Sequence, residues 1–153
     1  MAKIDLICVG RAKPSSPEQA LYQKYVDRCR FDIQLIELAE SKASKPALAM
    51  AEEAKAIRGK MHASAFCICL DERGKDLTSP ELAQVLEGAF LDQRRPTFLI
   101  GGSHGLDPSL RQRADLSLRF GRVVWPHLLI RGMLGEQMYR CQTILEGHPY
   151  HRS

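Results

Sequence analysis

The sequence predicts an α/β protein with a mostly parallel sheet flanked by helices. Two observations support this prediction. Short apolar stretches of strand length alternate along the chain with longer stretches whose apolar residues recur at helical spacing. Glycine-containing segments follow two of the apolar stretches, as expected where a parallel strand ends and the chain turns toward a helix.

The composition is that of a globular domain. The chain has 153 residues, of which 44% are hydrophobic and 26% are charged. We therefore expect residues 1–153 to form one domain with a substantial core. No apolar run reaches membrane-spanning length, and the start of the chain lacks the apolar stretch of a secretory signal. A cytoplasmic protein without a membrane partner is expected.

The five cysteines form no Cys-x-x-Cys pair. Cys67 and Cys69 alternate within an expected strand, so their side chains should lie on the same face of the sheet. An odd number of cysteines without a metal-binding spacing is typical of reduced, buried thiols in a reducing compartment.

The first half of the chain contains three expected strands and two expected helices. The first helix should begin at Ser16, which is a suitable N-cap, because Pro17 fits the first turn and Gln19 closes a capping box. Gly59 is expected to end the second helix. The strands are expected at Lys3–Gly10, Phe31–Leu38 and Ala65–Leu70, and the apolar stripes of the helices run from Leu21 to Cys29 and from Ala47 to Ile57.

The second half alternates in the same way. Ser79, followed by Pro80 and Glu81, is expected to cap a third helix, and Asp107 begins a short fourth one before Pro108. The remaining expected elements are strands at Thr97–Ile100 and Ser117–Val124 and a last helix from roughly His127 to Glu146.

Ligands of parallel α/β sheets bind in the loops beyond the carboxyl ends of the strands. The candidate site therefore consists of Leu70–Gly74, Gly101–Gly105 and the segment after Leu118. Asp71 and Glu72 are a possible metal or general-base pair, but neighbouring residues at a strand end point apart, so a polar turn is the simpler interpretation.

The glycine loop is the most informative part of this candidate site. Phe98–Leu106 reads FLIGGSHGL, so a buried strand leads into three glycines within five residues. Its spacing is neither the dinucleotide fingerprint nor a P-loop, and no lysine follows to hold phosphates. A nucleoside bound by backbone groups suits the loop better than a phosphate-rich cofactor. A tight turn without a ligand is about equally compatible with the loop alone.

Positive charge is concentrated in the last third of the chain. The net charge is +4, and from Gly101 onward seven arginines accompany four acidic residues. Arginine suits phosphate contacts and stacking on bases. Ordinary surface ion pairs explain this charge equally well.

The chain ends with His148, Tyr150, His151 and Arg152 in a short polar segment. A frayed terminus is one interpretation. A zinc site using the two histidines is another, but no third ligand is evident, so we expect no metal. The third is an aromatic and cationic clamp that holds an RNA base.

Three blocks of the sequence together resemble the ribosomal RNA large-subunit methyltransferase H family. The resemblance extends over the whole chain, and its most specific part is the closing His-Pro-Tyr-His-Arg sequence with the Glu-Gln-x-Tyr-Arg helix before it. The blocks are Leu70–Lys75, Phe98–Leu106 and the run from Trp125 to Arg152.

The resemblance implies a SPOUT-type fold with a trefoil knot near the C-terminus, S-adenosylmethionine bound in the knot, and a homodimer. It implies methylation of N3 of a pseudouridine in 23S (large-subunit) ribosomal RNA, with the assembled ribosome as the expected substrate. A ribosome-binding or assembly factor without catalytic activity is the alternative on the same fold. A dinucleotide-dependent oxidoreductase is a third possibility, but the fingerprint for its cofactor is missing.

The resemblance also implies roles for particular residues. Cofactor contacts are expected from Leu70, Gly101, Phe120, Gly121, Arg122, Val123, Val124 and Trp125. His148, Tyr150 and Arg152 are expected to bind RNA, with His151 and Arg140 as candidate catalytic groups.

Two further features of the last helix have open interpretations. Gly132 and Gly135 lie on one face, where they allow close approach of either a second subunit or another part of the same chain. His127, at the start of this helix, is as compatible with a capping or packing role as with catalysis.

Overall fold

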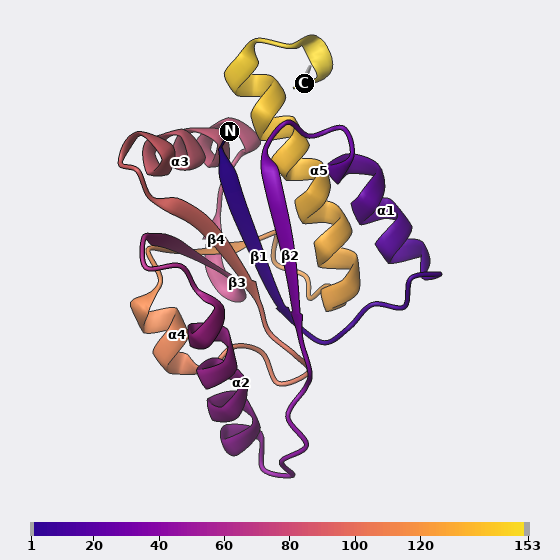
Figure 1. The fold of residues 1–153 in the computed structure, drawn as a ribbon, viewed down its shortest axis with the longest axis vertical. Helices are drawn as coiled ribbons and strands as arrows, with labels where there is room; N and C mark the ends of the chain where they lie inside the picture. The colour runs from indigo at the N-terminus through magenta and orange to yellow at the C-terminus, as the bar shows by residue number, and fades with distance from the viewer. Residues whose placement is uncertain (1, 152–153) are drawn as a thin grey trace.

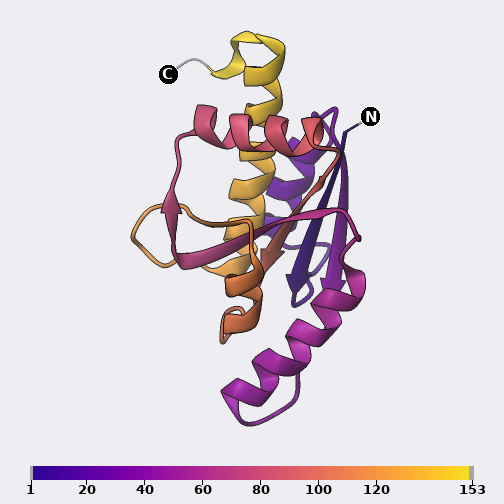
Figure 2. The same cartoon turned by 90° about the vertical axis from the view of Figure 1, so that its left-hand side faces the viewer.

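A computed structural model describes residues 2–151 of the chain. Five parallel strands form one sheet in the order β2–β1–β4–β3–β5, with helices on both faces (Figures 1 and 2). The predicted fold class is therefore confirmed. The strands are β1 (Lys3–Val9), β2 (Asp32–Leu38), β3 (Ala65–Asp76), β4 (Arg95–Ile100) and β5 (Leu116–Arg119). The helices are α1 (Pro17–Val26), α2 (Pro46–Lys60), α3 (Ser79–Leu91), α4 (Pro108–Arg113) and α5 (His127–Glu146), followed by the 3-10 turn η1 (Pro149–His151).

Each face of the sheet has its own hydrophobic layer. Leu6 of β1 belongs to the layer beneath α1, α3 and α5, whereas Ile7 belongs to the layer beneath α2 and α4. This alternation follows from the two-residue period of a strand. Cys67 and Cys69 both lie in the second layer, as predicted. Burial raises the pKa of the Cys8 thiol to about 12, which is typical of an unreactive, protonated core cysteine.

The helices alternate between faces because the connections alternate in direction. From β1 to β2 and from β3 to β4, the chain steps one way across the sheet, through α1 and α3. From β2 to β3 and from β4 to β5 it steps the other way, through α2 and α4. Crossovers of a single hand require this pattern. The adjacent strands β1 and β4 are therefore followed by helices on opposite faces of the sheet. The same holds for the adjacent strands β4 and β3. Such divergence of neighbouring connections opens crevices at the carboxyl ends of the strands.

Close packing of α1 on α5 explains the two glycines of the last helix. A Cβ atom on Gly132 would lie 2.7 Å from Cδ2 of Leu21. On Gly135 it would lie 3.3 Å from Cδ2 of Tyr22. These glycines therefore allow α1 to pack closely on α5 within the chain.

The helix boundaries differ slightly from the sequence prediction. Ser16 caps α1 as expected, since its hydroxyl accepts the Gln19 N–H at 3.2 Å. The N-cap of α3 is Thr78 rather than Ser79, and a complete capping box with Glu81 fixes this start. Helix α2 continues through Gly59 and ends at Lys60. No helix within residues 2–151 is long and apolar enough to cross a bilayer.

The expected third strand is longer than predicted because it contains a bulge. Leu70 and Lys75 both pair with Leu118 of β5, so residues 71–74 are extruded between them and the strand resumes up to Asp76. A Cβ atom on Gly74 would lie 2.6 Å from the backbone carbonyl carbon of Leu118. Only glycine allows the two strands to approach this closely.

The expected strand at Ser117–Val124 is in fact the short β5, which ends at Arg119. Beyond it the chain leaves the sheet as a loop that returns to α5. The side chains of Val123 and Val124 are 61% and 77% exposed. Their β-branched character suggested a strand, but they lack a neighbouring strand and a core to cover them.

Candidate functional site

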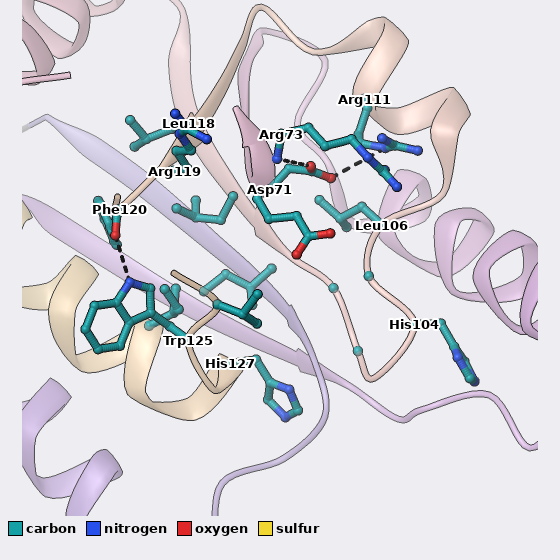
Figure 3. A pocket seen from close by; sticks show the side chains of 18 of the residues that line it. Asp71, Arg73, His104, Leu106, Arg111, Leu118, Arg119, Phe120, Trp125 and His127 are labelled. Carbon is teal, nitrogen blue, oxygen red and sulfur yellow. Dashed lines mark hydrogen bonds and ion pairs between the residues drawn. The ribbon is translucent and has the colours of Figure 1, made fainter. Parts of the chain in front are cut away.

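Three loops surround a cavity of about 610 Å³ at the carboxyl ends of β3, β4 and β5 (Figure 3). They are the bulge after Leu70, the glycine loop after Ile100 and the loop that joins β5 to α5. The sequence predicted that these three segments form one site. The structure brings all three together around one cavity.

Most of the expected cofactor contacts line this cavity. The lining includes Leu70, Gly101, Phe120, Gly121, Val123, Val124 and Trp125. Arg122 does not belong to the lining residues, although both of its neighbours do. The Trp125 indole N–H donates a hydrogen bond to the Phe120 carbonyl at 2.7 Å, which holds the last of the three loops in its bent form.

The glycine loop is a tight turn at the edge of the cavity. Gly105 donates its N–H to the Gly102 carbonyl at 3.0 Å and has a φ of +81°. A Cβ atom on Gly101 would lie 2.5 Å from the carbonyl carbon of Gly105. Glycine at position 101 is therefore required by the loop's own backbone, whereas we expected it to leave room for a ligand.

Asp71 is held in place by the bulge and by α4. One carboxylate oxygen accepts the Arg73 N–H at 2.8 Å, and the other lies 3.5 Å from Nε of Arg111 (Figure 3). The Asp71 side chain is only 9% exposed. These two contacts orient Asp71 and tie the bulge to α4.

A second ion pair stabilises the base of the bulge. Arg119 donates two hydrogen bonds to Asp76, at 3.0 and 2.9 Å. These bonds outweigh the opposing effect of desolvation and hold the pKa of Asp76 below its ordinary value. The pair links the end of β5 to the far side of the bulge, so both walls of the cavity are tied to each other.

The cavity is suited to a nucleoside that carries a charged tail. Its walls combine apolar side chains, among them Leu106, Leu118 and Phe120, with charged ones that include Asp71, Glu72 and Arg111. This combination is typical of small-molecule sites, in which a few polar groups orient an otherwise apolar ligand.

The predicted RNA-binding tail lies far from this cavity within the same chain. His127 and Ile130 at the start of α5 line the cavity, whereas Tyr150 and His151 follow the end of the helix (Figure 1). The Tyr150 hydroxyl reaches back along α5 as far as Glu136, about midway along the helix, but no residue of the described tail lines the cavity. The described part of the tail therefore does not reach the cavity of its own chain.

The described part of the tail is docked on the second half of α5 and is not frayed. The Tyr150 hydroxyl donates to Glu136 at 3.0 Å, and its ring lies edge-on to Tyr139, with ring centroids 4.6 Å apart. Burial and the Glu136 carboxylate raise the pKa of Tyr150 to about 12. Arg140 lies 5.1 Å from the Tyr150 ring centroid.

The candidate catalytic groups of the tail are also distant from the cavity. Arg140 forms an ion pair with Glu136 at 2.7 Å, so its charge is already balanced. His148 accepts the Tyr150 N–H at 3.1 Å, and Nδ1 of His151 is buried without a hydrogen-bond partner in the described chain. Arg152 lies outside the described residues.

Comparison with known proteins identifies the family. The family model described as "Predicted SPOUT methyltransferase" matches residues 2–151. A ribosomal RNA large subunit methyltransferase H from Rhodopseudomonas palustris (strain BisA53) is 44% identical, with 99% of each chain covered. The protein of the same name from Rhizobium johnstonii is 44% identical and covers 98% of this chain and 99% of its own.

The chain belongs to the ribosomal RNA large-subunit methyltransferase H family. The sequence resemblance to this family is therefore confirmed.

The SPOUT fold of this family member also appears in solved structures of low sequence identity. One, titled "Structural insights into the 2-OH methylation of C/U34 on tRNA", matches with a TM-score of 0.54 and 17% identity over 96% of this chain and 99% of the other. A putative RNA methyltransferase from Bacillus anthracis matches with a TM-score of 0.51 and 10% identity over 96% of both chains. At these identities the matches show the fold alone.

Sequence reasoning missed one polar arrangement of this SPOUT domain. Arg131 is 1% exposed and donates to Glu37 at 2.7 Å and to the Gly10 carbonyl at 2.8 Å. Glu37 also accepts the Ala12 N–H at 2.7 Å. The only sequence signal was an arginine in the apolar stripe of the last helix, which indicates a buried partner but does not identify it.

Proposed function

We propose that this protein transfers the methyl group of S-adenosylmethionine to N3 of a pseudouridine in 23S ribosomal RNA. The observation that supports this most is the single cavity formed by the three predicted loops, in a chain that belongs to an rRNA methyltransferase family. The assembled ribosome is the proposed substrate. The same proposal puts the protein in the cytoplasm, where ribosomes are.

The residues of the cavity fit S-adenosylmethionine. The apolar walls, which include Leu70, Leu118 and Phe120, suit the adenine ring, and the backbone of the glycine loop suits the ribose. The charged groups on the bulge side suit the methionine ammonium and carboxylate. The bound cofactor supplies an activated methyl group, and the protein's task is to place the target nitrogen in line with it and to help remove its proton.

We further propose that the working enzyme is a homodimer with composite sites. We propose that Tyr150 and His151 contact the target base, but α5 separates them from the cavity of their own chain. A second subunit that brings its tail over the first subunit's cavity resolves this separation. The trefoil knot stays a prediction.

Two measurements test the proposed function. Mass spectrometry of large-subunit RNA from cells with and without the protein should show one methylated pseudouridine that disappears with the protein. Calorimetric titration with S-adenosylmethionine should show binding to the purified chain.

The alternatives give different outcomes. Lack of cofactor binding at near-millimolar concentration, together with unchanged RNA, would favour a ribosome-binding factor without catalytic activity. A response to NAD but not to S-adenosylmethionine would favour an oxidoreductase.

A further inference from the structure

We infer that His127 is the group that accepts the N3 proton of the target base, an inference that rests on the proposed function. His127 is the first residue of α5, directly after the N-cap Pro126, and lines the cavity. Among the described residues, the histidine rings that form hydrogen bonds are those of His62 and His148. The His127 ring is therefore available to a substrate.

The His127 ring faces a crevice at the edge of the cavity. A methyl group on Gly10, just after β1, would lie 3.8 Å from Nε2 of His127 and 3.9 Å from Oε1 of Glu40. A methyl group on Gly102, after β4, would lie 3.3 Å from the same Glu40 oxygen. The imidazole and the Glu40 carboxylate thus both approach the backbone at Gly10, and the same carboxylate approaches Gly102. Gly102 and His127 also line the main cavity, so this crevice adjoins it.

The course of the chain explains why a crevice opens here. β1 and β4 are neighbours in the sheet, but β1 leads to α1 on one face and β4 leads to α4 on the other. Such a divergence is where open α/β sheets bind their ligands. The cofactor cavity occupies the equivalent divergence between β4 and β3. A base held at the first divergence would lie next to a cofactor held at the second.

Buried hydrogen bonds fix the position of His127 relative to the crevice. Gly10 donates its N–H to Leu38 at 2.7 Å, and its carbonyl accepts from Arg131 at 2.8 Å. Arg131 lies four residues after His127, hence on the same face of α5. Because Arg131 also binds Glu37, it joins the start of α5 to the ends of both β1 and β2.

Other basic groups near the cavity are less suitable. His104 is exposed and its ring points away from the cavity, beyond the glycine loop, whereas the His127 ring is directed toward the loop that follows β1 (Figure 3). Asp71 already accepts from Arg73 and contacts Arg111. Glu72 also lines the cavity, but it belongs to the bulge, on the side where the charged groups suit the charged tail of the cofactor.

Charged groups of both signs approach this part of the site. Oε1 of Glu40 and Nε2 of His127 lie 3.9 and 3.8 Å from the same methyl position on Gly10, and Glu53, from α2, has Oε1 3.4 Å from the methyl position on Gly102. Arg11 directly follows Gly10, and Arg131 forms an ion pair with Glu37.

The proposed step balances as follows. The N3–H bond breaks and its proton passes to the His127 ring. The N3 electron pair forms the bond to the methyl carbon, while the electron pair of the carbon–sulfur bond stays on sulfur, which becomes a neutral thioether. The ring later returns its proton to solvent.

The test compares His127→Gln with the unaltered protein in single-turnover methylation of ribosomes that lack the methyl group, across a range of pH. A lost general base should lower the rate at neutral pH by about 10²- to 10⁴-fold. The rate of the unaltered protein should rise with pH and level off once the imidazole is neutral. The variant's rate should keep rising, since only the ionised imide then reacts. Cofactor affinity and melting temperature should be unchanged.

His62→Gln is the matched control, because His62 lies before β3 at the amino ends of the strands and should affect neither rate nor profile. An unchanged rate and plateau in His127→Gln would overturn the inference. So would weakened cofactor binding in that variant, or the same loss of plateau in His104→Gln instead. A failure of the unaltered protein to methylate ribosomes would instead remove the proposed function.

Discussion

Gly101 shows how a single residue can be required by the loop it begins. A side chain at this position would point into the backbone of Gly105, 2.5 Å away, and not into the open cavity. Gly88 in α3 is the opposite case, since a Cβ atom there would meet nothing within 4 Å. Both glycines look alike in the sequence, and only their surroundings distinguish them.

We expect Gly101→Val to abolish S-adenosylmethionine binding by opening the glycine loop. The overpacking should also cost about 1–3 kcal/mol in the free energy of unfolding, while the sheet and helices remain folded. Calorimetric titration and urea unfolding measure the two effects. Gly88→Ala is the control, which should keep affinity and gain about 0.5–1 kcal/mol from helix propensity. Retained affinity in a folded Gly101→Val protein would remove Gly101 from the site.

Glu37 is the residue whose titration should be visible in acid unfolding. Burial opposes its ionisation, but the Ala12 N–H and the Arg131 guanidinium outweigh burial and hold the pKa of Glu37 below its ordinary value of 4.5. A lowered folded-state pKa stabilises the protein fully above the ordinary value, and this stabilisation is lost as the pH falls through the folded value.

We expect Glu37→Gln to destabilise the protein at pH 7 by on the order of 2–3 kcal/mol, because buried Arg131 loses its counter-charge. The difference between the two proteins should shrink below pH 4.5, where Glu37 itself becomes protonated. Urea unfolding at a series of pH values measures this difference. A constant gap across the acid range would show that the charge of Glu37 does not matter.

At the scale of elements, the sequence correctly predicted the features that depend on residues close together in the chain. The stripe of α5 and its bounds at His127 and Glu146 were predicted correctly because Pro126 precedes the helix and Gly147 follows it in the left-handed conformation that ends helices. The bulge of β3 was missed. Its Asp-Glu-Arg-Gly sequence reads as a turn, and only pairing with distant Leu118 makes the strand resume.

In the candidate site, too, some features could be predicted from the sequence and others could not. The three cavity loops were predictable because each directly follows a strand, and parallel strands end at the same edge of the sheet. The Arg131 hydrogen bonds to Glu37 and Gly10 were not, because their partners are 94 and 121 residues away in the sequence. The crevice beside His127 depends on these contacts, so the structure was needed to find it.

The tail is an element whose removal should separate cofactor binding from turnover. We expect deletion of residues 148–153 to leave S-adenosylmethionine affinity nearly intact, because the cavity is at the other end of α5. Methyl transfer should be lost, since contacts made only with the reacting base act on turnover. A ribosome methylation assay beside a cofactor titration measures both. Normal methylation by the truncated protein would show that the tail has no role in the RNA site.

Tyr150 should account for part of the tail's effect. Tyr150→Ala is expected to cost on the order of 1–3 kcal/mol in kcat/KM if its ring stacks on the base. Tyr150→Phe is the matched variant, because it keeps the ring and loses only the hydroxyl that donates to Glu136. Equal losses in both variants, measured in the same methylation assay, would assign the effect to the docking of the tail instead of to stacking.

At the scale of the whole molecule, α5 acts as a spacer between two sets of functional groups. The cavity lies at its first turn, and the tail docks further along the helix, where Glu136 and Tyr139 hold Tyr150. We therefore expect an obligate homodimer by light scattering, in which each complete site uses the cavity of one subunit and the tail of the other. A fully active monomer would contradict this.

Mixing two inactive variants tests the composite site directly. Gly101→Val lacks a working cavity but keeps its tail, and the chain without residues 148–153 lacks a tail but keeps its cavity. Each should be inactive alone. After unfolding and refolding together, about half of the dimers are hybrids, and each hybrid has one complete site, so roughly a quarter of the normal number of sites should return. Because the damaged cavity and the missing tail then belong to different sites, methylation must recover if the tail acts across the dimer. If each tail instead served its own chain, every site in the hybrid would contain one defect, and mixing would restore nothing.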